Sequence, residues 1–184
     1  LHLPLQAMEI ERFAGVGEIS LDNSRDDLRQ ILAADLASVP NVVGINNHMG
    51  SLITRHPGHM SWLMAEIAAF GGLFFVDSYT TSQSVAQPAA AEHGIPSARR
   101  HVFLDDAPGV PNLEKEYARL LLLAREQGFA VAIGHPYPET TAFLQAQLPA
   151  LATQGIELVS VADVIARQNA LLTEQQNTVL AGGL

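Results

Sequence analysis

The fold class is indicated first by VVGINNH, residues 42–48, in which a short β-branched apolar run leads directly into polar residues. Short apolar runs of this kind are typical of strands that are covered on both faces. The sequence therefore predicts five buried strands, with Leu1–Leu3 as the end of a sixth. The five runs cover residues 42–45, 72–76, 101–104, 130–133 and 156–161.

Helical periodicity fills the gaps between these runs. Ser24 is the expected N-cap of a helix over residues 25–37, and Gly128 should end a helix that begins near Pro111. Strands and helices that alternate at about 30-residue spacing indicate βαβ units and a parallel sheet. We expect an α/β fold, best described as an incomplete (β/α) barrel, with one domain over residues 1–176 and a loose tail at 177–184. The remaining expected helices cover residues 60–70, 84–93, 140–154 and 162–176.

Composition excludes several classes of protein. Ten Lys and Arg against 19 Asp and Glu give a formal net charge of −9, which argues against a nucleic-acid binder because such proteins need clustered cations. The absence of cysteine excludes disulfides, thiolate zinc sites and cysteine nucleophiles. No run of about 20 apolar residues is present, so no membrane-spanning helix is expected. Composition predicts neither the compartment nor the oligomeric state.

Polar side chains follow the predicted strands, where the carboxyl ends of parallel strands form a common mouth. Three imidazoles with carboxylates at such a mouth would suit an open catalytic metal site, which needs nitrogen and oxygen donors and a position for water. Each residue also has a structural interpretation, because histidines after strands often cap turns and aspartates often form them. The residues concerned are His2, Asn46, Asn47, His48, Asp77, Ser78, Asp105 and His135.

Five sequence blocks follow one another in a distinctive order: LHLP at 1–4, GINNHMGS at 44–51, FVDS at 75–78, RHVFLD at 100–105 and IGHPYPET at 133–140. Over residues 1–165 their order and spacing resemble the divergent polysaccharide deacetylases of bacteria. The resemblance implies a distorted, incomplete (β/α) barrel whose first strand or strands lie outside this chain. It also implies a hydrolase that removes acetyl groups from a cell-envelope polysaccharide, with a divalent metal, usually zinc.

The resemblance also implies roles for individual residues. His48 is the first expected metal ligand and His2 the second, while His135 is expected to act either as a ligand or as the general acid. Asp77 is expected in the catalytic site, where it would orient an imidazole or contact substrate. The expected substrate-binding residues are Asn46, Asn47, Ser78 and Tyr137.

Two departures from the better-known deacetylases keep a second hypothesis open. Those enzymes carry a His-x-x-x-His pair, but Leu52 stands four residues after His48. Their Asp-Asp pair lies on a first strand that would precede Leu1. The alternative is therefore a non-catalytic glycan-binding or envelope-assembly protein on the same fold. In either case the resemblance implies a periplasmic or secreted protein whose targeting segment is outside this chain.

Overall fold

The computed structural model describes residues 1–9 and 15–182, which form two compact units, Leu1–Arg99 and Arg100–Leu184. Each unit has its own hydrophobic core and is described by itself. The single domain expected over residues 1–176 stays a prediction.

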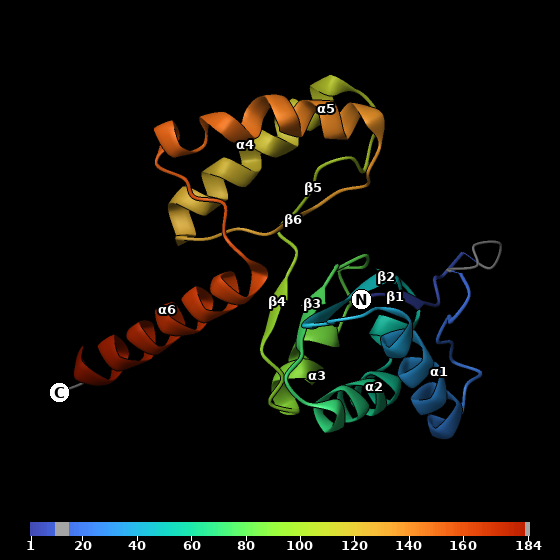
Figure 1. Ribbon diagram of the computed structural model, residues 1–184. Helices are drawn as coiled ribbons and strands as arrows, with labels where there is room; N and C mark the ends of the chain where they lie inside the picture. Colours follow the sequence, from blue (N-terminus) through green and yellow to red (C-terminus); the bar gives the residue numbers. More distant parts are fainter. Residues whose placement is uncertain (10–14, 183–184) are drawn as a thin grey trace. The chain divides into compact units, whose positions relative to one another are not determined.

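The first unit is built on a parallel four-stranded sheet whose strands lie in sequence order (Figure 1). Its first three strands confirm predicted strands, although with shifted ends. The fourth was not predicted, because Ser97–Arg99 contains no apolar run and becomes a strand only by pairing with its neighbour. The strands are β1 (His2–Leu5), β2 (Gly44–Met49), β3 (Phe74–Asp77) and β4 (Ser97–Arg99).

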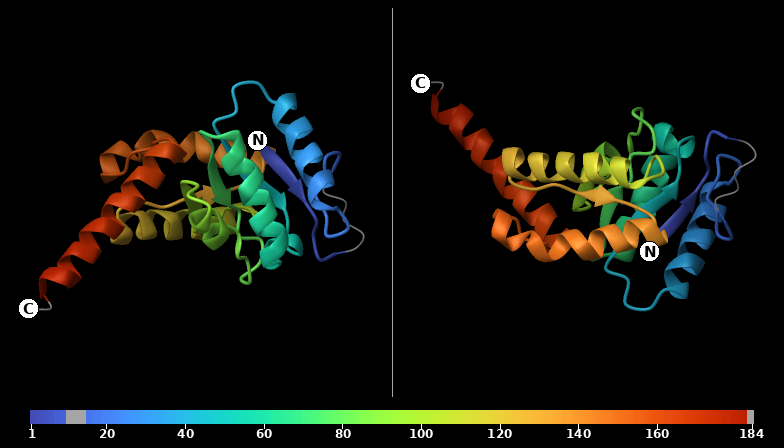
Figure 2. Two further views of the ribbon diagram at one scale, coloured as in Figure 1. Left: turned by 90° about the horizontal axis from the view of Figure 1, so that it is seen from below. Right: turned by 90° about the horizontal axis from the view of Figure 1, so that it is seen from above.

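Three helices lie on one side of this sheet, as Figures 1 and 2 show: α1 (Arg25–Ser38), α2 (Pro57–Phe70) and α3 (Ala86–Glu92), with a short 3-10 helix, η1 (Ile53–Arg55), before α2. Side chains alternate between the faces of a strand, and residues paired in register share a face. Leu3, Leu5, Ile45 and Phe75 therefore pack in the core beneath the helices. The residues that alternate with them along β1 and β2, among them His2 and His48, belong to the opposite face of the sheet.

Two helix ends confirm the predicted capping. The Ser24 hydroxyl accepts a hydrogen bond from the Asp27 backbone N–H, and the Asp27 carboxylate accepts one from the Ser24 backbone N–H, which completes a capping box. In the second unit, Gly128 follows the last residue of a helix with a φ of 82°, in the left-handed region that glycine enters without a steric penalty.

In its described part, the second unit contains a two-stranded parallel sheet, three α-helices and two 3-10 helices (Figures 1 and 2). The last helix runs through the expected tail as far as Gly182, and residues 161–181 contain no Gly or Pro that would stop it. Residues 183–184 lie outside the described part. The elements are β5 (Val102–Phe103), α4 (Val110–Gln127), β6 (Ala132–Ile133), α5 (Pro138–Gln147), the 3-10 helices η2 (Leu148–Ala150) and η3 (Ala152–Gln154), and α6 (Val161–Gly182).

The strand predicted over residues 156–161 is also wrong. Residues 156–160 have no regular secondary structure, and the next residue, Val161, begins α6. Leu158 is 73% exposed. An apolar run becomes a strand only when another strand supplies its hydrogen bonds, and the sheet of β5 and β6 does not extend to this run in the described part of the chain.

Parallel strands joined by helices confirm the α/β fold class. Among the described residues the strands form two separate open sheets. Of the helices in the described ranges, none combines the length and hydropathy required to cross a bilayer.

Candidate functional site

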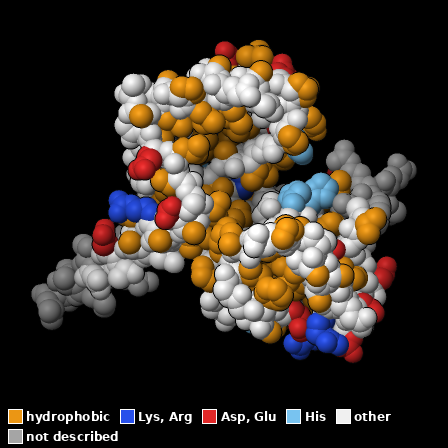
Figure 3. Space-filling view, viewed as in Figure 1, with side chains coloured by type: hydrophobic (Ala, Val, Ile, Leu, Met, Phe, Trp, Pro, Cys, Tyr) orange, Lys and Arg blue, Asp and Glu red, His pale blue; other side chains and the backbone are white. Residues whose placement is uncertain are grey.

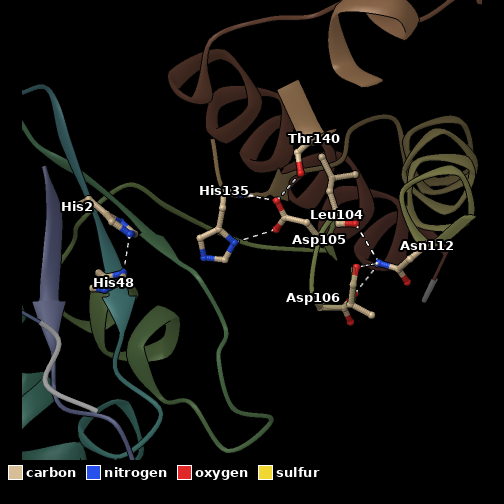
Figure 4. A network of polar contacts seen from close by, with 9 residues as sticks. His2, His48, Leu104, Asp105, Asp106, Asn112, His135 and Thr140 are labelled. Atoms are coloured by element: carbon tan, nitrogen blue, oxygen red, sulfur yellow. Dashed lines mark hydrogen bonds and ion pairs between the residues drawn. The ribbon is translucent and has the colours of Figure 1, made fainter. Parts of the chain in front are cut away.

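Two imidazoles meet on the open face of the four-stranded sheet. His2 Nε2 lies 3.0 Å from His48 Nδ1, and the two rings are inclined by 58° with their centroids 4.7 Å apart. His2 pairs in register with Asn46, so His48 is its diagonal neighbour on the adjacent strand, which lies within reach of a long side chain. Figure 4 shows the two rings pointing toward one another, and Figure 3 shows histidine side chains at the surface of this unit.

The position of these residues along the strands differs from the prediction. His2 was expected after the end of a strand, but it is the first residue of β1, and Asn46–His48 lie inside β2. The strand pairing continues as far as Leu5 and Met49, so these polar residues lie within the paired part of the strands. The two imidazoles meet because His2 and His48 lie on the same face of the sheet. They were expected to meet at the ends of the strands instead.

The His2–His48 pair suits a divalent metal in its donor chemistry. Imidazole nitrogens are common zinc ligands, and binding to a metal replaces a proton on a nitrogen. In this pair the two nitrogens lie at hydrogen-bond distance, and the tautomers of the two rings decide which one donates. Among the described residues no group of three or more His, Asp or Glu side chains gathers closely enough to hold an ion. The pair is therefore a two-nitrogen donor set.

Of the three predicted substrate-binding residues in this unit, only one is accessible on the face of the imidazoles. Asn46 is half-buried, and its Nδ2 donates a hydrogen bond to Ser78 Oγ at 3.2 Å. Asn47 and Ser78 are 1% and 2% exposed. Strand alternation puts Asn47 on the face that α1–α3 cover, which favours a structural role over contact with substrate.

Asp77, expected in catalysis, is enclosed by its own loop. Its Oδ1 accepts a hydrogen bond from the Tyr79 backbone N–H, and its Oδ2 accepts one from Ser84 Oγ, both at 2.8 Å. Burial raises the pKa of the Asp77 carboxyl, while hydrogen bonds from Tyr79, Ser84 and the Gln87 backbone and the charge of Arg99 oppose part of that rise. These contacts favour a structural role in the turn after β3 over the orientation of an imidazole.

The raised pKa of Asp77 predicts how stability depends on pH. A native state that holds a proton more tightly than the unfolded chain loses stability as the pH rises from the ordinary carboxyl pKa through the raised one. Asp77→Asn cannot ionise, so we expect a smaller fall in the free energy of unfolding over this window. Urea unfolding between about pH 4 and pH 7, followed by the fluorescence of Trp62, the only tryptophan, measures the fall.

Part of the fall in the free energy of unfolding with rising pH should remain in Asp77→Asn, because burial also raises the pKa of Asp35 in the same unit. An undiminished fall in Asp77→Asn would contradict the prediction.

The second unit holds an Asp–His dyad at the ends of its two strands. Asp105 Oδ1 lies 3.0 Å from His135 Nδ1, and Oδ2 accepts hydrogen bonds from the His135 backbone N–H at 2.7 Å and from Thr140 Oγ1 at 2.9 Å. The Asp105 side chain is 5% exposed, whereas that of His135 is 44% exposed. A buried carboxylate therefore holds an accessible imidazole in one orientation (Figure 4).

This arrangement determines which nitrogen of His135 is available for chemistry. An ionised carboxylate only accepts hydrogen bonds, so Asp105 keeps the proton on Nδ1 and leaves Nε2 to a reacting group. An imidazole held in this way can donate or accept a proton in general acid–base catalysis. Asp105 was expected at a strand end but without a role of its own. The usable signal is that Asp105 and His135 each lie two residues after the last residue of a strand.

An aromatic stack surrounds the His135 ring. Tyr137 stacks on it with ring centroids 4.9 Å apart and an inclination of 30°, and Phe103 lies 5.5 Å from it. Tyr137 is 53% exposed. Its accessible ring lies beside the imidazole, and its role as a substrate-binding residue stays a prediction.

The fold has a counterpart among solved structures. A crystal structure of an uncharacterized protein from Agrobacterium tumefaciens matches with a TM-score of 0.85 at 21% sequence identity, over 89% of this chain and 67% of that one. The model of the divergent polysaccharide deacetylase family matches residues 1–165. The chain belongs to this family.

Two curated bacterial proteins are similar in sequence. An uncharacterized protein of Haemophilus influenzae is 35% identical over 164 residues, which make up 89% of this chain and 58% of the relative. The uncharacterized protein YibQ of Escherichia coli is 34% identical over 145 residues, or 79% of this chain and 45% of the relative. The chain thus spans about half the length of these relatives.

Proposed function

We propose that this chain contributes to a metal-dependent carbohydrate deacetylase, which hydrolyses acetyl groups on a cell-envelope polysaccharide. The observation that carries the proposal is the dyad, in which the buried Asp105 carboxylate fixes an accessible His135 imidazole. Membership of the divergent polysaccharide deacetylase family supports a glycan as the substrate. Both residues belong to sequence blocks on which the family resemblance rests.

In the proposed reaction His135 is the proton donor. Water adds to the acetyl carbonyl as His135 Nε2 takes one of its protons, which leaves His135 as an imidazolium. The bond between the carbonyl carbon and the sugar nitrogen or oxygen then breaks as that atom takes the proton back from Nε2, and acetate is released. Asp105 stabilises the imidazolium through its hydrogen bond with Nδ1 and holds the ring in place. The exposed ring of Tyr137, which stacks on His135, would contact a sugar ring. In the first unit, Asn46 would offer hydrogen bonds to glycan hydroxyls.

His2 and His48 are the proposed metal ligands. A bound divalent ion such as zinc supplies Lewis acidity, which polarises a carbonyl and lowers the pKa of water. The two imidazoles would bind the ion in their neutral form, so loading should be weaker at acidic pH.

Metal binding by His48 tests the first half of the proposal. The protein, purified without chelator and incubated with zinc, should retain about one ion per chain in elemental analysis. His48→Ala should retain none, because it removes one of only two nitrogen donors. His56→Ala, which removes an exposed imidazole that follows η1, should bind zinc as the unmodified chain does. Full occupancy in His48→Ala would overturn the ligand assignment.

A non-catalytic glycan-binding or envelope-assembly protein is the second candidate. It is favoured by the two-donor set, since no third metal-binding side chain joins His2 and His48 among the described residues. The two candidates differ in turnover: a deacetylase releases acetate from an acetylated oligosaccharide, whereas a binding protein retains the saccharide unchanged. Either activity would suit a periplasmic or secreted protein.

A further inference from the structure

The buried side-chain amide of Asn47 joins the carboxyl ends of β2 and β3. Asn47 Oδ1 accepts a hydrogen bond from the Ser78 backbone N–H at 2.7 Å, and Asn47 Nδ2 donates one to the Met49 carbonyl, also at 2.7 Å. Asn47 is 1% exposed, so neither bond competes freely with water. The side chain therefore ties the backbone on either side of His48 to the neighbouring strand.

The backbone that Asn47 holds has an unfavourable conformation. Met49 has a φ of 53°, in the left-handed region that non-glycine residues rarely occupy. A conformation of this kind persists only where the surroundings impose it, and such positions cluster at functional sites. The bond from the buried Asn47 side chain imposes it here. The Met49 carbonyl also accepts a hydrogen bond from Thr80 Oγ1 at 2.9 Å, but that bond is exposed to water. His48 lies directly between Asn47 and Met49.

We propose that Asn47 is a positioning residue for His48, holding the end of β2 so that the His48 imidazole stays within reach of His2. This assignment rests on the proposed metal site and replaces the expected contact of Asn47 with substrate. Asn47 is on the helix-covered face, and His48 is on the open face, so Asn47 acts through the backbone. Its amide is required because only a side chain with both a donor and an acceptor can make the two bonds.

The test compares Asn47→Ala with Thr80→Val. Residues that orient metal ligands typically change affinity by about 10- to 100-fold when replaced, so we expect a loss of this order in zinc affinity for Asn47→Ala, measured by calorimetry. Thr80→Val removes an exposed hydrogen bond to the same Met49 carbonyl and leaves Ser78 anchored. It should therefore bind zinc with nearly unchanged affinity.

A readout that needs no metal separates this inference from the proposed function. Nuclear Overhauser contacts between the His2 and His48 rings should weaken in Asn47→Ala and persist in Thr80→Val. The Ser78 amide should also exchange faster with solvent in Asn47→Ala. If the unmodified chain binds no zinc, the metal proposal fails, and the ring contacts alone decide whether Asn47 positions His48.

Asn47→Asp provides a variant of the same shape if Asn47→Ala does not fold. It keeps an acceptor for Ser78 but presents an oxygen to the Met49 carbonyl, so the ring contacts should again weaken. Folded Asn47 variants that keep both the zinc affinity and the ring contacts of the unmodified chain would overturn the assignment.

Discussion

Replacing Asp105 with Asn should lower the rate of acetate release by about 10²- to 10⁴-fold, the usual contribution of a positioned proton donor. The carboxylate accepts hydrogen bonds from His135 Nδ1, the His135 backbone N–H and Thr140 Oγ1. An amide has one oxygen, so its NH₂ group must face either Nδ1 or the other two donors. The variant therefore either reverses the tautomer of His135 or loses the anchored geometry, and in both cases the imidazolium loses its counter-charge.

Asp106→Asn is the matched control for this prediction. Asp106 is the adjacent carboxylate, is exposed, and accepts a hydrogen bond from Asn112 Nδ2. Its replacement should leave acetate release within about threefold of the unmodified chain, since surface changes of this kind have small effects. Nitrogen NMR of the imidazole gives a second readout: the Nδ1 proton of His135 should be lost or shifted only in Asp105→Asn. Equal rates and spectra in the two variants would contradict the proposed dyad.

The local features of the fold could be predicted from the sequence because they depend on neighbouring residues. Ser24 caps α1 and Gly128 ends α4 through contacts within a few positions along the chain. Two strand assignments depended instead on distant partners. Ser97–Arg99 is polar and short yet pairs with β3, whereas residues 156–160 have the apolar pattern of a strand and find no partner among the described residues.

The sequence predicts which types of residue form the candidate site, but it predicts their arrangement in space only in part. Strand alternation alone would have separated Asn46 from Asn47, because Asn47 shares a face with the apolar Ile45. The partner of His135 could not be found in this way. The choice between Asp77 and Asp105 depends on which strand lies beside β6, and that strand is β5, whose end carries Asp105.

The largest expected loss of stability comes from Phe75→Ala. Phe75 is fully buried in β3 and pairs with both Ile45 of β2 and Ser97 of β4, so its ring fills the centre of the core under the sheet. Removal of a buried Phe ring typically lowers the free energy of unfolding by about 3–5 kcal/mol, through lost burial and the cavity that remains. Urea unfolding followed by Trp62 fluorescence reports on this unit, because the only tryptophan lies in α2.

Phe70→Ala removes the same ring from the end of α2, where it is 60% exposed, and should change the free energy of unfolding by less than about 0.5 kcal/mol. The comparison also links the core to the imidazole pair. Phe75 lies on the strand that leads to Ser78, whose N–H bonds to Asn47, so a loosened β3 should weaken the His2–His48 ring contacts as well. If Phe75→Ala were as stable as Phe70→Ala, the sheet that carries the two histidines could not be packed as described.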